Sequence, residues 1–143
     1  MSRDFNKNKV AVLTGAAKKI GRSTAIKLAE QGFNILIHTG GKSIEEAKDT
    51  IKLLEKFKIK SNYVTGDLAN LETINIIKDA ALKLGTPSVL VNNAGLRIHE
   101  HFEKIDYKDW KKVMTVNVDA SFLCAQALIT VSYTHLRAHE TPC

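Results

Sequence analysis

A glycine-containing loop near the N-terminus has the composition of a phosphate-binding site. The segment Thr14-Gly15-Ala16-Ala17-Lys18-Lys19-Ile20-Gly21 follows a short apolar run and leads into a pattern with helical periodicity. In a strand-loop-helix unit, glycines let the backbone approach a pyrophosphate closely, and the positive end of the helix faces that anion. Nucleotide binding is one interpretation of this loop, and a tight turn without a ligand is the other.

Further polar residues follow the later apolar runs. Asp67 comes after the third run, Asn92-Asn93-Ala94-Gly95 follows the fourth, and Asn117 lies within a long helical pattern. Asp67 could simply cap a loop, and the segment after the fourth run could be a strand-ending turn. Asn117 is harder to explain structurally, because Asn competes for backbone hydrogen bonds and disfavours helix interiors.

These polar residues must be positioned by alternating strands and helices. Near-continuous apolar strands separated by helical patterns indicate a parallel sheet covered on both faces. Right-handed crossovers then predict the strand order 3-2-1-4 in a doubly wound, Rossmann-type α/β fold. The predicted strands span residues 10–13, 34–38, 62–65 and 88–91.

Each predicted helix has recognisable end signals. The first stops at Gly32, the second opens with the capping box Ser43-Ile44-Glu45-Glu46, and the third follows Asn70 and ends before Gly85. A fourth helix is expected over residues 106–128, with Asp106 as its N-cap and a kink along its length.

The loop resembles that of the short-chain dehydrogenase/reductase family, whose fingerprint is T-G-x-x-x-G-x-G. Thr14, Gly15 and Gly21 match it, while Lys19 stands where the middle glycine belongs. A basic residue at that position within TGAAK is similar to the pteridine reductase branch of the family.

The later polar residues extend the resemblance over residues 8–129, because they match an Asp near the adenine, the N-N-A-G segment and the Asn of a catalytic tetrad. The family's Asn supports a kink and a water in the proton relay, so the resemblance implies a catalytic role for Asn117. The residues expected to bind the cofactor are Gly15, Lys18, Lys19, Ile20, Gly21, His38, Lys42, Ser43, Asp67, Leu68, Asn93, Ala94 and Gly95.

The stretch after the second strand favours NADP(H) over NAD(H). NAD-preferring folds present an acid there to the ribose 2′-hydroxyl, and residues 38–43 contain none. A 2′-phosphate requires cations and hydroxyls instead. Lys18, Lys42 and Ser43 supply them, although Ser43 has a competing role as a helix cap.

The catalytic Ser, Tyr and Lys of the family cannot be placed. Tyr133 and Arg137 mimic the Tyr-x-x-x-Lys spacing, but with Arg, and without an intervening fifth strand. The chain is therefore expected to be an inactive N-terminal part, residues 1–130, of a homo-oligomeric reductase acting on a small carbonyl, imine or pterin-like substrate. A non-catalytic nucleotide-binding domain and a fragment of an oxoacyl reductase are the alternatives.

The C-terminal residues 131–143 look foreign to the fold. Residues 131–141, VSYTHLRAHET, resemble a translated sequencing adapter, so this tail is predicted to be non-native. The fold would then stop after the fourth strand and its following helix. That leaves an apolar strand at the sheet edge.

Composition excludes several other classes. The 143 residues carry a net charge of +6 from 21 Lys and Arg against 15 Asp and Glu, scattered along helical segments rather than gathered in a nucleic-acid-binding stripe. No secretory signal and no membrane span is expected, which favours a cytoplasmic protein with Cys124 and Cys143 reduced. No metal site is predicted, since His99 and His101 lack further ligands.

Overall fold

The computed structural model describes residues 3–137, with side chains described through Thr134. Four parallel strands form one sheet in the order β3-β2-β1-β4, which confirms the predicted doubly wound architecture. Each strand begins within two residues of its predicted position. The strands are β1 (Lys9–Leu13), β2 (Asn34–Thr39), β3 (Ser61–Thr65) and β4 (Thr86–Val91).

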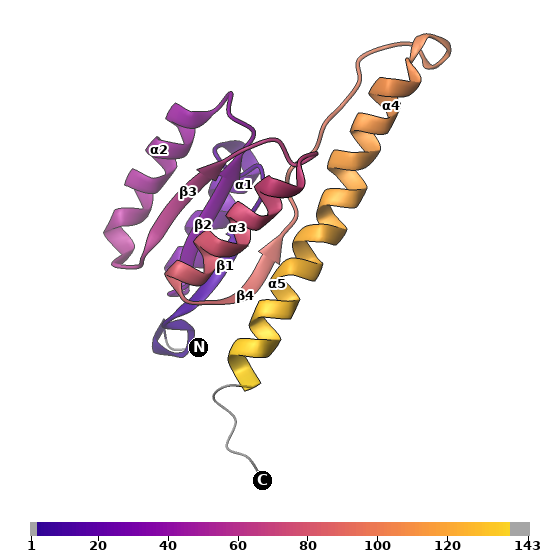
Figure 1. Cartoon of the computed structure of the whole chain (residues 1–143). Helices are drawn as coiled ribbons and strands as arrows, with labels where there is room; N and C mark the ends of the chain where they lie inside the picture. The colour runs from indigo at the N-terminus through magenta and orange to yellow at the C-terminus, as the bar shows by residue number, and fades with distance from the viewer. Residues whose placement is uncertain (1–2, 138–143) are drawn as a thin grey trace.

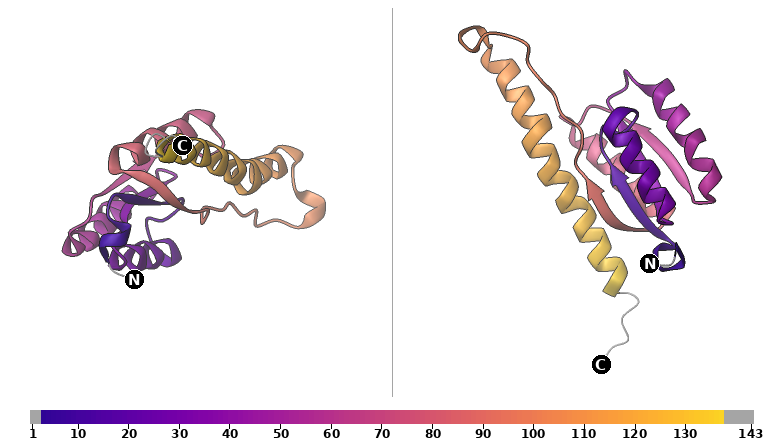
Figure 2. Two further views of the ribbon diagram at one scale, coloured as in Figure 1. Left: turned by 90° about the horizontal axis from the view of Figure 1, so that it is seen from below. Right: turned by 180° about the vertical axis from the view of Figure 1, so that it is seen from behind.

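Helices cover both faces of this sheet (Figures 1 and 2). One face carries α1 and α2, and the opposite face carries α3 and α5. The helices are α1 (Lys19–Glu30), α2 (Ile44–Leu54), α3 (Leu71–Leu84), α4 (Tyr107–Met114) and α5 (Ala120–Arg137), with short 3-10 turns at η1 (Arg3–Asn6), η2 (Glu55–Phe57) and η3 (Phe102–Lys104).

Alternating side chains of the central strands build two separate apolar cores. Val10 and Val12 of β1 face the layer of α3 and α5, while Ala11 and Leu13 face α1 and α2. All six residues of β2 are buried, because β2 is covered on both faces and flanked by β1 and β3. This packing fixes the strand positions from which the loops emerge.

The register brings the carboxyl ends of the strands to one edge of the sheet. Leu13 of β1 lies opposite Ile37 of β2 and Val91 of β4, and Thr39 of β2 lies opposite Thr65 of β3. The four loops that follow these strands therefore gather at the same edge, where ligands of open α/β sheets bind.

The N-termini of the helices show which capping predictions hold. Asp106 caps α4 by accepting a hydrogen bond from the Lys108 backbone N–H at 2.9 Å. The predicted capping box at Ser43 is wrong, because the Ser43 side chain makes no capping hydrogen bond. Its partner Glu46 instead places its carboxylate 3.8 Å from the Lys18 ammonium.

The long C-terminal helix changes its hydrogen-bonding pattern part of the way along. A π-helical segment, η4 (Thr115–Asp119), joins α4 to α5 and contains Asn117. The helix also runs past the predicted end at residue 128, to Arg137. Residues 138–143 of the predicted tail lie outside the described part, and the non-native origin of 131–143 stays a prediction.

One segment corrects the expectation that nothing here could span a membrane. The helical stretch Tyr107–Thr134 is long and apolar enough to do so by length and composition. A core helix passes the same test, and Ala120, Cys124 and Leu128 of α5 are buried against the sheet and α3. Length and composition are thus weak support for a membrane span.

Strand β4 lies at an edge of the sheet, as predicted. Within residues 3–137 it pairs with β1 alone, and α5 lies alongside it (Figure 2). Its last three residues, Val89, Leu90 and Val91, are half-buried.

Candidate functional site

The loop after β1 makes a close approach that only glycine permits. Gly15 has a φ of +59°, and a Cβ added to it would lie 2.7 Å from the Cα of Ala94. Any side chain at this position would therefore collide with the loop after β4. The predicted loop residues Gly15 and Ala94 are thus neighbours in space.

Hydrogen bonds tie these two loops together. The Thr14 hydroxyl accepts from the backbone N–H of Asn93 at 3.2 Å and of Ala94 at 3.1 Å. In return, the Asn93 side-chain amide donates to the Gly15 carbonyl at 2.9 Å. Thr14 is only 2% exposed, whereas its partners Asn93 and Ala94 are half-buried. The glycine loop and the N-N-A-G segment form one unit.

Gly21 lets the first turn of α1 pack onto this unit. A Cβ on Gly21 would lie 2.4 Å from the Ala16 Cα and 2.9 Å from the Asn93 side-chain nitrogen. Since backbone atoms cannot yield, glycine is required here. The start of α1 is therefore held directly against the two loops.

Lys19 has a left-handed backbone conformation, which glycine adopts more readily than other residues. Its φ is +53°, in the left-handed region, which disfavours a side chain by about 1–2 kcal/mol. The Lys19 side chain is exposed next to Lys18 and Ile20, so this loop presents two ammonium groups to solvent.

His38 connects the glycine loop to the loop after β3. Its Nδ1 accepts from the Gly15 N–H at 3.3 Å, which leaves the proton on Nε2 to donate to the Gly66 carbonyl at 2.8 Å. Burial lowers the pKa of His38 below its usual 6.5, although the Gly66 bond and the Asp67 charge oppose that shift. Both ring nitrogens are engaged, so His38 positions the loop rather than offering its ring to a cofactor.

The loop after β3 contains the predicted residues Asp67 and Leu68. The exposed Asp67 carboxylate accepts from the Ala69 N–H at 2.9 Å, which is the loop-capping role that its position allowed. Leu68 is 6% exposed and packs into the core on the α3 side. Its side chain therefore anchors the loop, and only its backbone remains for a ligand.

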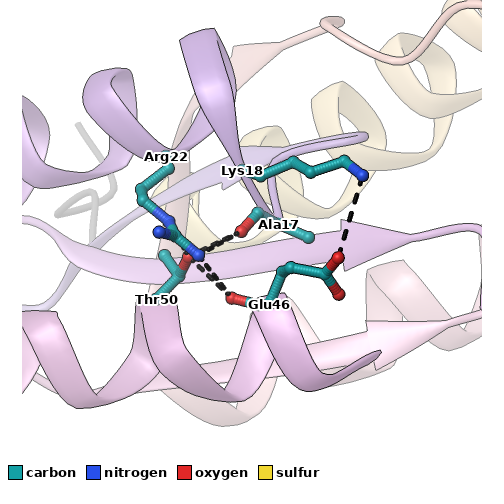
Figure 3. A network of polar contacts seen from close by, with 5 residues as sticks. All are labelled: Ala17, Lys18, Arg22, Glu46 and Thr50. Carbon is teal, nitrogen blue, oxygen red and sulfur yellow. Dashed lines mark hydrogen bonds and ion pairs between the residues drawn. The ribbon is translucent and has the colours of Figure 1, made fainter. Parts of the chain in front are cut away.

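A network of hydrogen bonds that the sequence did not predict holds the glycine loop against α2 (Figure 3). We call this network, formed by Ala17, Arg22, Glu46 and Thr50, the polar knot. The Arg22 guanidinium donates to the Ala17 carbonyl at 3.2 Å, the Glu46 carbonyl at 3.0 Å and the Thr50 hydroxyl at 2.8 Å. The Thr50 hydroxyl in turn donates to the Ala17 carbonyl at 2.7 Å. Arg22 is 24 residues from Glu46 and 28 from Thr50 in the chain, so no local sequence pattern predicts these bonds.

Of the residues predicted to bind a 2′-phosphate, only Lys18 is seen beside this knot. Lys18 is half-exposed, and its ammonium pairs with Glu46 (Figure 3). Lys42 is exposed in the open turn after β2, where Gly40 and Gly41 have no atoms near their Cβ positions. Ser43 is half-buried, and within residues 3–137 no hydrogen bond engages its hydroxyl.

Asn117 joins the π-helical segment to the chain after the N-N-A-G motif. Its side-chain oxygen accepts from the Leu96 N–H at 2.7 Å, and its amide donates to the Leu96 carbonyl at 2.9 Å. Gly95 lies beside it, with its Cβ position 3.8 Å from that oxygen. Asn117 therefore holds the Gly95–Leu96 segment in place.

The Tyr-x-x-x-Lys spacing also occurs at Tyr107 and Lys111, which the sequence predictions overlooked. Both residues belong to α4, which extends away from the sheet (Figure 1). Tyr107 is 71% exposed, and the Lys111 ammonium lies 5.9 Å from the centre of its ring. No contact links this pair to the glycine loop, so it forms no catalytic pair there.

Metal or thiol chemistry has no support in the described part of the chain. Among residues 3–137, no three His, Cys, Asp or Glu side chains gather as a metal site. Cys124 is buried, and burial raises the pKa of its thiol to about 11, so the thiol stays protonated. Cys143 lies outside the described residues.

The arrangement fits a dinucleotide. The first turn of α1 has no side-chain cap at Lys18, so its N–H groups are available to an anion. Gly15 and Gly21 let the glycine loop, the start of α1 and the N-N-A-G segment pack closely together. The exposed side chains of Lys18 and Lys19 belong to the same loop. The donors are backbone N–H groups and cations, which suits phosphate.

Comparison with known proteins agrees with this geometry. The model of the family described as short chain dehydrogenase matches residues 9–135. The 3-oxoacyl-(acyl-carrier-protein) reductase FabG of Staphylococcus epidermidis is 35% identical over 83% of this chain and 49% of its own length. The L-2,3-butanediol dehydrogenase of Corynebacterium glutamicum is 39% identical over 84% of this chain and 47% of its own.

Solved structures give the same result. The crystal structure of acetoin dehydrogenase YohF from Salmonella typhimurium superposes with a TM-score of 0.83 at 32% identity, covering 90% of this chain and 51% of that one. The chain spans about half the length of the curated relatives that it matches.

Proposed function

Because this chain belongs to the short chain dehydrogenase family, we propose that it is the cofactor-binding half of an NADP(H)-dependent oxidoreductase. The observation that carries the proposal is the joining of the glycine loop to the N-N-A-G segment through Thr14 and Asn93. This joint places an uncapped helix N-terminus beside the end of β4. A tight turn without a ligand would not need two glycines in close contact with a second loop.

Particular residues of this chain would hold the cofactor. The loop from Gly15 to Gly21, with the first N–H groups of α1, would bind the pyrophosphate. Backbone groups of Asp67 and Leu68 would lie beside the adenine. The segment from Asn93 to Gly95 would lie beside the nicotinamide. Bound NADPH supplies a hydride to a carbonyl or imine carbon.

The preference for NADP(H) rests on charge. Lys18, Lys42 and the free hydroxyl of Ser43 are suited to a 2′-phosphate, and residues 38–43 contain no acid that would repel it. Losing one charge-assisted contact to that phosphate is expected to reduce affinity by about 1.5–3 kcal/mol, roughly 10- to 150-fold.

Asn117 acts on the reaction by positioning rather than by proton transfer in this chain. Its amide holds both backbone groups of Leu96, which fixes the segment that would lie beside the nicotinamide. The 143-residue chain is proposed to bind cofactor without turnover, because no proton donor of the Tyr-Lys type can be assigned to the site.

The parent enzyme is proposed to reduce a small carbonyl or imine substrate. The names of a 3-oxoacyl reductase and a butanediol dehydrogenase among the relatives support carbonyl chemistry. Lys19 in the glycine position supports a pterin-like substrate as the alternative within the same reaction class. Exposed apolar side chains along α4 and α5, including Trp110 and Phe122, support a homo-oligomer. The cytoplasmic location stays a prediction from the sequence.

The test is equilibrium titration of the chain with NADPH and NADH, followed by cofactor fluorescence. We expect tighter binding of NADPH, and we expect Lys18→Met to abolish most of the difference. Lys27→Met is the matched control, since Lys27 pairs with Glu30 on the far part of α1. Equal affinities for the two cofactors, or an unchanged preference in Lys18→Met, would contradict the proposal.

A further inference from the structure

Lys18, the cation best suited to a 2′-phosphate, already has an acidic partner. Its ammonium lies 3.8 Å from the Glu46 carboxylate, and the two side chains are 50% and 40% exposed. Glu46 belongs to the first turn of α2, just beyond the acid-free turn formed by residues 38–43. An acid therefore reaches the phosphate side of the site from the helix rather than from the turn.

The pair is held by rigid backbone anchors. Thr50 is completely buried, and its hydroxyl lies 2.7 Å from the Ala17 carbonyl and 3.0 Å from the Glu46 carbonyl. Arg22 donates to the same two carbonyls (Figure 3). Because Ala17 precedes Lys18, these bonds fix the backbones that bear both charged side chains. Glu46 therefore stays within reach of Lys18 without any side-chain bond of its own to the knot.

We propose that Glu46 is a specificity-determining residue, which weakens the binding of 2′-phosphorylated nucleotides by competing for Lys18. The inference rests on the proposed function, because it assumes a nucleotide at the glycine loop. To bind Lys18, a 2′-phosphate must replace Glu46 as the partner of the ammonium group. It is also repelled by the Glu46 carboxylate nearby. A nucleotide with a free 2′-hydroxyl meets neither obstacle. Lys18 favours NADP(H) over NAD(H), and Glu46 reduces this difference in affinity between the two cofactors.

The neighbouring residue Glu45 offers a matched control. Glu45 occupies the same helical turn, is 82% exposed, and pairs with Lys48 at 3.0 Å rather than with Lys18. Glu46→Gln and Glu45→Gln therefore remove the same charge from the same turn. Gln at position 46 also keeps the backbone carbonyl that Arg22 and Thr50 bind.

The experiment is calorimetric titration of the full 143-residue chain with adenosine 2′,5′-bisphosphate and with 5′-AMP, which differ by the 2′-phosphate. Glu46→Gln is expected to tighten the bisphosphate by about three- to tenfold, the effect of freeing one partly exposed charge. Its affinity for 5′-AMP should stay within about twofold, as should both affinities of Glu45→Gln. In a Lys18→Met background, the gain from Glu46→Gln should fall to less than half.

Distinct results would overturn the inference and the proposed function. Suppose that the wild type prefers the bisphosphate, but Glu46→Gln binds it no more tightly than Glu45→Gln does. The role proposed for Glu46 would then be wrong, and the proposed function would stand. A full gain in the Lys18→Met background would mean that Glu46 does not act through Lys18. Failure of the folded wild type to bind either probe would overturn both, and circular dichroism of each variant establishes that it is folded.

Discussion

Replacing Thr14 by Val should loosen the joint between the glycine loop and the N-N-A-G segment. Val keeps the shape of Thr but removes the oxygen that accepts from the Asn93 and Ala94 N–H groups at 3.2 and 3.1 Å. The Asn93 N–H keeps a second acceptor, the Val91 carbonyl at 3.0 Å. Most of the lost stability should therefore come from the Ala94 N–H, which is left without this acceptor.

The expected magnitude follows from this asymmetry. Because Ala94 is half-buried, leaving its N–H unsatisfied costs about 1–2 kcal/mol, and weakening of the shared Asn93 bond adds less than about 1 kcal/mol. The free energy of unfolding should fall by about 2 kcal/mol. With a urea slope of about 1–3 kcal/mol per molar, the midpoint should move down by roughly 1 M.

Urea unfolding followed by circular dichroism measures the loss, and amide hydrogen exchange locates it. Exchange at Ala94 should accelerate in Thr14→Val and stay slow in Thr14→Ser, which keeps the oxygen but loses a methyl group. Wild-type stability together with wild-type exchange at Ala94 in Thr14→Val would refute the reasoning, because the bonds would then contribute nothing to the joint.

Three further outcomes are expected. Gly21→Ala should destabilise the chain by more than about 2 kcal/mol in thermal or urea unfolding, since its Cβ would lie 2.4 Å from a backbone atom. The control Gly40→Ala should change stability by less than about 0.5 kcal/mol, because no atom lies within 4 Å of its Cβ position. Lys19→Gly should raise the free energy of unfolding by about 0.5–1 kcal/mol, because glycine relieves the φ of +53° but gains unfolded-state entropy; an unchanged or lower value would contradict this. The free energy of unfolding should fall by up to about 1.4 kcal/mol per pH unit as the pH drops below about 6.5. The reason is that His38 takes up a proton more readily in the unfolded chain than in the folded one, where burial lowers its pKa. His38→Gln should remove that dependence and His101→Gln should not; equal pH profiles for the two variants would refute the assignment.

The strands and the glycine loop were predictable because their signals are local. Apolar runs identify the four strands, and handedness then leaves the order β3-β2-β1-β4. The T-G-A-A-K-K-I-G segment marks its own turn, and the structure keeps a glycine-like φ at Lys19. The close contact between Gly15 and Ala94 follows from the parallel register of β1 and β4, which the same pattern implies.

The polar knot and its consequences could not be predicted from local patterns. Arg22 and Thr50 are 28 residues apart, and their bond depends on how α1 and α2 pack. The predicted capping box does not form, because the Ser43 backbone, with φ of −122° and ψ of 40°, lacks the extended conformation of an N-cap. The sequence placed His38 in the site, but it did not predict the burial that engages both of its ring nitrogens. Its part in cofactor binding stays a prediction.

The most direct test of a dinucleotide site at the carboxyl edge of this sheet is amide NMR of the labelled chain during titration with NADP⁺. The proposed site predicts saturable shifts at Gly15, over residues 18–21 and over residues 93–95. Gly32 and Gly85, which pack against the N-terminal segment and the start of the sheet, should not shift. Shifts confined to that opposite edge, or no shift in the glycine loop at saturating cofactor, would contradict the account.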